Sequence, residues 1–155
     1  PRHTKEDVSI APDKLTPYGL HKYFSELLIR KHFNNYLILR SSMILGSNLK
    51  KGPLYDAMHH ESLFITRDSR LQMITTKSIA GIICTLIEKK ITRNVFNMGG
   101  IGTFSFSTLD RFVPEPVAYR ADAEKQLYEM NVAKMLKVYP LKTSEEYLRE
   151  FLHGL

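Results

Sequence analysis

The 155-residue sequence contains no tryptophan and only one cysteine, Cys84. A single thiol cannot form a disulfide within the chain, and chains without disulfides are usual in reducing compartments, so we expect a cytoplasmic protein. Cys84 stands close to Ile82, Ile83 and Leu86 in the sequence. These apolar neighbours predict a buried structural thiol and argue against a cysteine nucleophile.

The sequence also lacks long apolar runs. None approaches the roughly 18 residues that a membrane-spanning helix needs, and the polar start has no apolar segment of the kind found in signal peptides. We therefore expect no association with a membrane. Because the chain begins with Pro1 and soon reaches a capped helix, we expect it to be an excised or processed piece of a longer protein.

Charges of one sign are nowhere concentrated, although the net charge is +6 with neutral histidines. The densest basic runs are only Lys50-Lys51 and Lys89-Lys90. Proteins that bind single-stranded nucleic acid interleave basic and aromatic side chains, and this sequence has no such stripe. The distribution argues against nucleic acid and suits a pyrophosphate-bearing small molecule better.

Two further kinds of site are missing. No Gly-x-x-Gly-x-x-Gly turn connects a strand to a helix, so the sequence has no dinucleotide-binding fingerprint. Residues 99–102, Gly-Gly-Ile-Gly, lack the third glycine and the following helix, and they predict a flexible loop. Adjacent His59 and His60 point apart on a helix and have no companion ligands, so no metal site is predicted.

The composition is that of an ordinary globular domain, with 43% hydrophobic and 25% charged residues, and the chain is long enough for a core of its own. Its most informative stretch is residues 16–46. Thr16 is a good helix N-cap, and Pro17 suits the first helical position because its missing N–H costs nothing there. A helix over residues 17–33 is predicted.

Tyr18 and Lys22 are four residues apart on this helix, so their side chains share one face. An ammonium group beside a phenol favours the phenolate form. A tyrosine in that setting can donate or accept a proton at a hydroxyl or carbonyl group that is being oxidised or reduced. Because Tyr-x-x-x-Lys pairs also arise by chance, the residues around the pair decide its meaning.

The surrounding sequence extends this pair into a longer pattern. Pro-Tyr-Gly-x-x-Lys opens the helix, Glu26 follows, an apolar strand over residues 36–39 leads into Arg40, and Ile-Leu-Gly closes the stretch. This block resembles the extended short-chain dehydrogenase/reductase family, the NAD-dependent nucleotide-sugar epimerases and dehydratases. The similarity is strongest over residues 16–46, moderate over 73–155, and limited to the family's C-terminal portion.

The resemblance implies an α/β fold: the C-terminal part of a Rossmann-like parallel sheet plus a small α+β substrate-binding region. Residues 1–46 and 76–98 would form the sheet-associated part of a single unit, and residues 47–75 and 99–155 the substrate-binding part. It also implies a homodimer through helix 17–33. The alternative, that the helix's apolar stripe belongs to the chain's own core, stays open; the stripe consists of Leu20, Phe24, Leu27 and Leu28.

The resemblance assigns roles in catalysis and cofactor binding. Tyr18 would be the acid/base, Lys22 would assist it, and both would contact the cofactor. The apolar run 36–39 predicts a parallel strand buried on both faces, and ligands of open α/β sheets lie beyond the carboxyl ends of such strands. The residues that follow this strand are therefore implied to contact the nicotinamide: Ser41, where the family usually has proline, Ser42, Met43 and Ile44.

The expected substrate-binding residues are Arg40, Asn48 and Arg70. Many family members carry an Arg-Asp-aromatic triplet that contacts the nucleotide sugar. In this chain residues 72–74, Gln-Met-Ile, stand at the aligned positions, with Arg70 as the nearest guanidinium.

Local patterns predict the remaining elements. Gly52-Pro53 starts a short helix, strands follow at residues 63–66, 71–74, 94–98 and 117–119, and Ser105 or Ser107 caps a short helix through Phe112. Asn131 caps a short helix over residues 132–137, and Thr143-x-x-Glu146 is a capping box. Thr76 is expected to cap an amphipathic helix; its apolar side carries Ile79, Ala80, Ile83, Leu86 and Ile87.

The sequence therefore predicts the C-terminal, substrate-binding part of an NAD- or NADP-dependent epimerase, dehydratase or reductase of small molecules such as nucleotide sugars. The family holds the dinucleotide mainly on a glycine-rich half that these residues lack, so the fragment alone is expected to be inactive. The alternative is a non-catalytic binding or regulatory module that retains the family scaffold.

Overall fold

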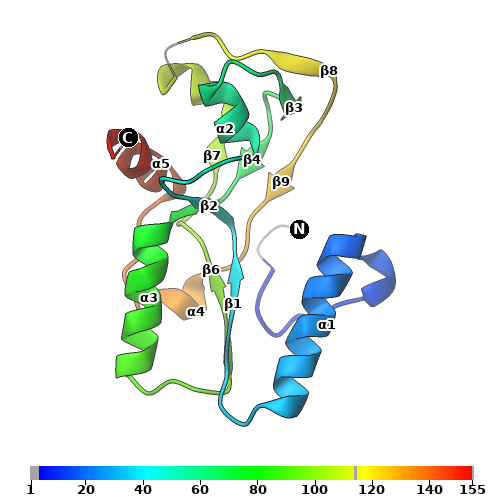
Figure 1. Ribbon diagram of the computed structural model, residues 1–155, viewed down its shortest axis with the longest axis vertical. Helices are drawn as coiled ribbons and strands as arrows, with labels where there is room; N and C mark the ends of the chain where they lie inside the picture. The colour runs from blue at the N-terminus through cyan, green and yellow to red at the C-terminus, as the bar shows by residue number, and fades with distance from the viewer. Residues whose placement is uncertain (1–3, 114, 155) are drawn as a thin grey trace.

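Two pairs of parallel strands run through the middle of the fold in the computed structural model, which describes residues 4–113 and 115–154 (Figure 1). Strand β1 (Leu37–Ser41) pairs with β6 (Asn94–Met98), and β2 (Met43–Leu45) pairs with β5 (Met73–Thr75). Both pairs are parallel, and the helices lie beside them. The predicted α/β class with a parallel sheet is confirmed.

Strand β1 differs from its prediction in length and burial. It begins one residue later than the predicted 36–39 and ends two residues later, so Arg40 and Ser41 lie within it. All five of its residues are half-buried, and the prediction of burial on both faces is wrong. Helix α1 (Pro17–His32), which lies beside β1, buries only Glu26, so it covers the strand incompletely, and β1 has a strand neighbour on one edge only among the described residues.

Helix α1 begins as predicted. Thr16 caps it, with its Oγ1 3.2 Å from the Gly19 nitrogen that donates to it, and Pro17 occupies the first position. The helix lies beside β1 on the side away from α3 (Thr76–Glu88) (Figure 1).

The predicted cap of α3 is wrong, and its predicted apolar side is right only for Leu86 and for Ile79, which packs against the core. Thr75, not Thr76, is the N-cap, and its side chain accepts a hydrogen bond from the Ser78 nitrogen. Ile82 and Leu86 are fully buried, whereas Ile83 and Ile87 are 39% and 63% exposed. The apolar residues of α3 cover more than one side of the helix, so their spacing alone did not show which row faces the strands.

The predicted single strand over residues 71–74 is wrong. Strand β4 (Arg70–Leu71) and strand β5 belong to different sheets, and Gln72 joins them. The Gln72 N–H donates to the Tyr128 carbonyl, while its own carbonyl accepts from the Met43 N–H. The chain thus passes from one sheet to the other at this residue.

The upper part of the fold contains short elements around one helix (Figure 1). Helix α2 (Pro53–Met58) follows Gly52 as predicted. Strand β4 pairs with β7 and β9, and β3 pairs in parallel with β8, which starts at the end of the predicted strand 117–119. The bounds are β3 (Leu63–Ile65), β7 (Phe104–Ser105), β8 (Tyr119–Glu124) and β9 (Leu127–Tyr128), with short 3-10 helices η1 (Pro12–Lys14) and η2 (Phe106–Arg111).

Two hydrophobic cores hold these parts together. One lies under α2 and the short strands, and includes Leu45, Leu54, Leu63, Phe104 and Phe106. The other lies between α3, β6 and the C-terminal helices, and includes Ile82, Leu86, Phe96, Met135 and Tyr147.

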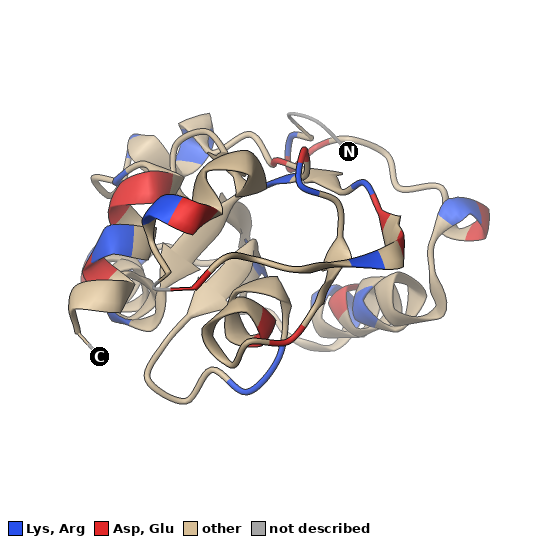
Figure 2. Cartoon of the chain, turned by 90° about the horizontal axis from the view of Figure 1, so that it is seen from above, with Lys and Arg blue, Asp and Glu red and all other residues tan. Residues whose placement is uncertain are grey.

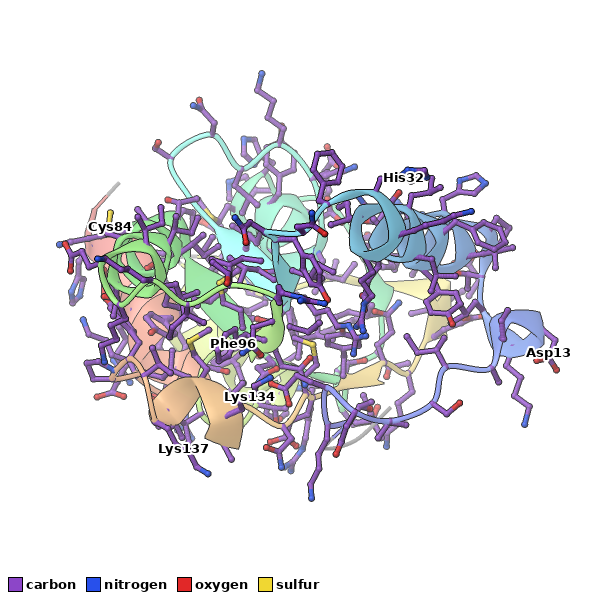
Figure 3. All side chains as sticks on the ribbon, turned by 90° about the horizontal axis from the view of Figure 1, so that it is seen from below. Asp13, His32, Cys84, Phe96, Lys134 and Lys137 are labelled. Atoms are coloured by element: carbon purple, nitrogen blue, oxygen red, sulfur yellow. The ribbon has the colours of Figure 1, made fainter. Side chains whose placement is uncertain are left out.

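The C-terminal helices are α4 (Ala133–Leu136) and α5 (Ser144–His153). The predicted capping box is present, because the Thr143 hydroxyl accepts from the Glu146 nitrogen while the Glu146 carboxylate accepts from the Thr143 nitrogen. Asn131 acts near its predicted place: its Oδ1 accepts from the Ala133 nitrogen, although Val132 is the N-cap residue. Lys134 of α4 lies 4.7 Å from the Phe96 ring centroid (Figure 3).

The glycine segment after β6 is not the flexible loop predicted. Gly100 is buried; its N–H donates to the Met73 carbonyl at 2.8 Å, and its carbonyl accepts from Gln72 Nε2 at 2.7 Å. A Cβ at Gly100 would lie 2.7 Å from the Ser144 nitrogen and 2.8 Å from the Met73 carbonyl oxygen. Glycine is needed here because two backbones approach it closely.

Cys84 is exposed on the outer side of α3, so the prediction of a buried thiol is wrong (Figure 3). It belongs neither to the buried row of Ile82 and Leu86 nor to a core of the described residues. Within residues 4–113 and 115–154 no helix is long and apolar enough to cross a membrane. Lysine and arginine are interspersed with aspartate and glutamate along the chain (Figure 2).

Candidate functional site

The first turn of α1 presents the Tyr18–Lys22 pair to solvent. Tyr18 is 73% exposed, and Lys22 Nζ lies 5.5 Å from the centre of the Tyr18 ring. The helix therefore brings the two side chains together on one face, as the four-residue spacing predicts. The ammonium group stands over the aromatic ring, where it makes a cation–π contact.

Glu26, one turn further along, joins α1 to β1. Its Oε1 lies 2.8 Å from Arg40 Nη2 and 2.5 Å from Arg30 Nη2, and its Oε2 lies 3.1 Å from Arg40 Nε. Burial raises the pKa of Glu26, but the hydrogen bonds and charges of Arg40 and Arg30 outweigh burial and leave the pKa below its ordinary value. Glu26 is therefore an ionised, paired carboxylate at neutral pH.

The predicted nicotinamide-contacting residues lie where β1 passes into β2: Ser41 ends β1, Ser42 joins the strands, and Met43 and Ile44 belong to β2. Ser41 Oγ donates to the Ser42 carbonyl at 3.1 Å, and the Ser42 nitrogen donates to the Met98 carbonyl. Met43 is half-buried at the start of β2, and Ile44 is 43% exposed. This junction between β1 and β2 lies at the carboxyl end of β1, where ligands of parallel sheets bind.

The Ser42 hydroxyl, at the junction of β1 and β2, has no hydrogen-bond partner. It is buried and, alone among the described residues, has a buried side-chain oxygen or nitrogen without a hydrogen-bond partner. A buried hydroxyl without a partner costs free energy, on the order of 1–3 kcal/mol. The hydroxyl lies against Gly99, 2.9 Å from where a Cβ on that residue would stand, so it is enclosed by the chain's own atoms. Binding of a nicotinamide here stays a prediction.

The predicted substrate residues are spread over the fold. Asn48 is exposed in the turn after β2, and Arg70 is exposed on β4. The structure does not place these two in one hydrogen-bonded cluster with Arg40, whose guanidinium binds Glu26 and the Glu6 carbonyl.

Residues 72–74 have a structural role. Gln72 is 1% exposed; its Nε2 donates to the Gly100 and Met130 carbonyls, and its Oε1 accepts from the Met130 nitrogen. Met73 and Ile74 are fully buried. None of the three side chains reaches the surface to contact a ligand.

Tyr128 on β9 is a candidate site residue that the sequence did not reveal. Burial raises the pKa of its phenol, the positive charge of Arg40 opposes this rise, and Tyr18 adds to it. Tyr128 is contributed by a two-residue strand, and no periodicity or motif marked it.

The histidines of the α2 region do not form a metal site. The His59 ring stacks on Tyr55 with centroids 3.9 Å apart, and its Nδ1 lies 2.9 Å from the Tyr55 carbonyl oxygen. Among the described residues no group of three or more His, Cys, Asp or Glu side chains is arranged to hold a metal ion.

Comparison with known proteins found similarity in structure alone. No protein-family model matches the sequence, and no curated protein matches it. Among solved structures, dTDP-glucose 4,6-dehydratase from Bacillus anthracis in complex with NAD has a TM-score of 0.74 at 17% identity, covering 99% of this chain and 55% of that one. UDP-glucuronic acid 4-epimerase from Bacillus cereus in complex with NAD has a TM-score of 0.74 at 18% identity, with coverages of 97% and 54%.

A short-chain dehydrogenase/reductase superfamily protein from Agrobacterium tumefaciens with bound NAD has a TM-score of 0.72 at 18% identity, covering 98% of this chain and 60% of that one. The chain thus spans little more than half the length of these structures. Its fold is that of the C-terminal part of Rossmann-like NAD-dependent epimerases and dehydratases. The family resemblance of the sequence is confirmed at the level of fold.

Proposed function

We propose that this chain is the substrate-binding C-terminal part of an NAD- or NADP-dependent enzyme that epimerises, dehydrates or reduces a nucleotide sugar. The observation that carries the proposal is the Tyr18–Lys22 pair, which shares one face of a helix that Glu26 joins to Arg40 of β1. The fold is shared with a dTDP-glucose 4,6-dehydratase and a UDP-glucuronic acid 4-epimerase, both solved in complex with NAD. This similarity supports the same class of enzyme for the present chain.

The proposed roles follow from chemistry. Tyr18 exchanges a proton with the reacting hydroxyl or carbonyl oxygen, and Lys22 stabilises the phenolate and binds the cofactor ribose. The nicotinamide, when bound, accepts and returns a hydride. Ser41 at the end of β1, the linking Ser42, and Met43 and Ile44 of β2 are proposed to border the nicotinamide site, because they lie at the carboxyl end of β1.

Substrate recognition is assigned to the exposed polar residues of the upper part. Asn48 and Arg70 are exposed, and a guanidinium is well suited to a pyrophosphate because it offers paired donors. Tyr128 lies near Tyr18 and would border the sugar. The buried residues 72–74 do not take part, which distinguishes this chain from family members with the Arg-Asp-aromatic triplet.

We expect the 155-residue chain alone to show no saturable binding of NAD(H) or NADP(H) below millimolar concentration. The reason is that a dinucleotide needs a glycine-rich turn and a helix N-terminus for its pyrophosphate, and the sequence contains no such turn. Isothermal titration calorimetry measures this directly. A micromolar dissociation constant would mean that the cofactor site lies within these residues.

We further propose a homodimer through α1. Its exposed apolar residues would pair with the same patch of a second copy about a two-fold axis, as isologous interfaces do. Burying one such side chain contributes roughly 1.5–3 kcal/mol, so leaving them all in water is costly. Of the predicted stripe, Phe24, Leu27 and Leu28 are exposed by 48%, 42% and 58%, and Leu20 is half-buried.

Phe24→Glu is expected to shift a dimer at micromolar concentration toward monomer, because it places a charge in the interface. Sedimentation or light scattering measures the shift. Glu145→Gln, on exposed α5 surface, is the matched control and should leave the association unchanged. A stable folded monomer for the wild-type chain would refute the dimer.

A non-catalytic module with the same scaffold is the second candidate. The engagement of Arg40 within the chain and the burial of residues 72–74 favour it, since both remove expected ligand contacts.

A further inference from the structure

Helix α1 is attached to the rest of the chain at few points. Of its sixteen residues, all described, Glu26 alone is buried, with 8% of its surface exposed. Leu28 and Phe24, on the side away from Glu26, are exposed by 58% and 48%. Leu20 and Tyr23 are half-buried, so the helix has little hydrophobic packing against its own chain, and its one buried residue is charged.

Arg40 of β1 provides the attachment. It is the partner of Glu26 on the strand, with Nη2–Oε1 2.8 Å and Nε–Oε2 3.1 Å, so the contact is bidentate. Paired hydrogen bonds of this kind fix orientation as well as distance. The Arg40 side chain is 22% exposed and that of Glu26 9%, which shields the pair from water.

The remaining guanidinium nitrogen of Arg40, Nη1, contacts the N-terminal segment. Nη1 lies 3.3 Å from the Glu6 carbonyl oxygen, and the Glu6 carboxylate accepts from the Asn97 nitrogen of β6 at 2.9 Å. The Asn97 side chain in turn donates to the Thr4 carbonyl at 2.7 Å. One guanidinium therefore connects α1 to β1 and, through Glu6, to β6.

We propose that Arg40 is a positioning residue, which holds α1 and its first-turn Tyr18 against β1 by its bidentate contact with Glu26, and that it does not bind substrate. The inference rests on the proposed function only in the role it gives Tyr18. Its physical content is that Glu26 and Arg40 act through one contact, so removing both side chains opens α1 no further than removing either.

Amide hydrogen exchange of the 155-residue chain tests this, because it resolves local opening of α1 from global unfolding. Arg40→Met and Glu26→Leu are each expected to lower protection of the α1 amides about 100-fold, with amides of β5 and α5 unchanged. The double variant Glu26→Leu/Arg40→Met is expected to be about as open as either single variant, because the same contact is lost in all three. All variants are compared at equal protein concentration.

Arg30→Met is the matched control. Arg30 also binds Glu26, but it lies on the same helix, so its loss cannot detach the helix from the strand and should change protection less than about threefold. The proposal is overturned if Arg40→Met leaves α1 protected, if it lowers protection of every element alike, or if the losses of the two single variants add in the double variant. Exchange needs no cofactor or substrate, so its outcome is independent of the proposed enzymatic function.

Discussion

Replacing Tyr18 with phenylalanine is expected to lower turnover at least about a hundredfold in the complete enzyme that contains this segment. The substitution removes one hydroxyl from an exposed side chain and leaves the helix unchanged, so the loss reports the proton-transfer step. General acid/base catalysis contributes about 10²–10⁴-fold, which sets the size of the effect. Steady-state kinetics with the nucleotide-sugar substrate measures it.

Tyr23→Phe is the matched control on the same helix. Tyr23 is half-buried and outside the Tyr18–Lys22 face, so its loss should leave turnover within a few fold. Lys22→Met should both slow turnover and weaken cofactor binding, because Lys22 is assigned to the tyrosine and to the ribose. Unchanged turnover in Tyr18→Phe would remove the catalytic assignment.

Gly100→Ala is expected to destabilise the chain by about 3 kcal/mol or more. The added Cβ would lie 2.7 Å from the Ser144 nitrogen and 2.8 Å from the Met73 carbonyl oxygen, and both are backbone atoms that cannot turn away. Overpacking usually costs about 1–3 kcal/mol, and two fixed backbones put this site at the upper end or beyond. Urea unfolding measures the loss as a lower midpoint.

Gly102→Ala separates this packing effect from backbone strain. Gly102 has a φ of 66° but nothing within 4 Å of the added Cβ. It should cost only about 1 kcal/mol, the usual penalty for a side chain in the left-handed region. If Gly100→Ala unfolds at the same urea concentration as the wild type, the close packing of the glycine segment is wrong.

Features that depend on a few neighbouring residues could be predicted from the sequence. Thr16 with Pro17 fixed the start of α1, and Thr143 with Glu146 fixed the start of α5, because a cap is decided within one turn. Strand β6 was predicted at its true bounds, since a short apolar run flanked by turns is the pattern of a buried parallel strand.

Features that depend on contacts between residues far apart in the sequence could not be predicted from it. The spacing of apolar residues in α3 allowed several buried rows, and only packing against Phe96 and Met135 selects Ile82 and Leu86. The glycine segment looked flexible because its partners, Met73 and Ser144, are far away in the sequence.

The candidate site was predicted only in part, because some of its contacts are local in the sequence and others are not. Tyr18 and Lys22 are close in sequence, so their shared face followed from helix geometry. Tyr128 and the Glu26–Arg40 contact depend on how β9, β1 and α1 come together, which no local pattern encodes.

The central claim is that these residues are the tyrosine-bearing part of a dinucleotide-dependent enzyme. Sequencing the coding DNA upstream of Pro1 tests it most directly. The account predicts, in the same reading frame, a strand followed by a Gly-x-x-Gly-x-x-Gly turn and a helix, which would hold the cofactor pyrophosphate, and a further serine or threonine to assist Tyr18. A start codon at this point, or an unrelated domain in place of the glycine-rich turn, would contradict it and favour the non-catalytic module.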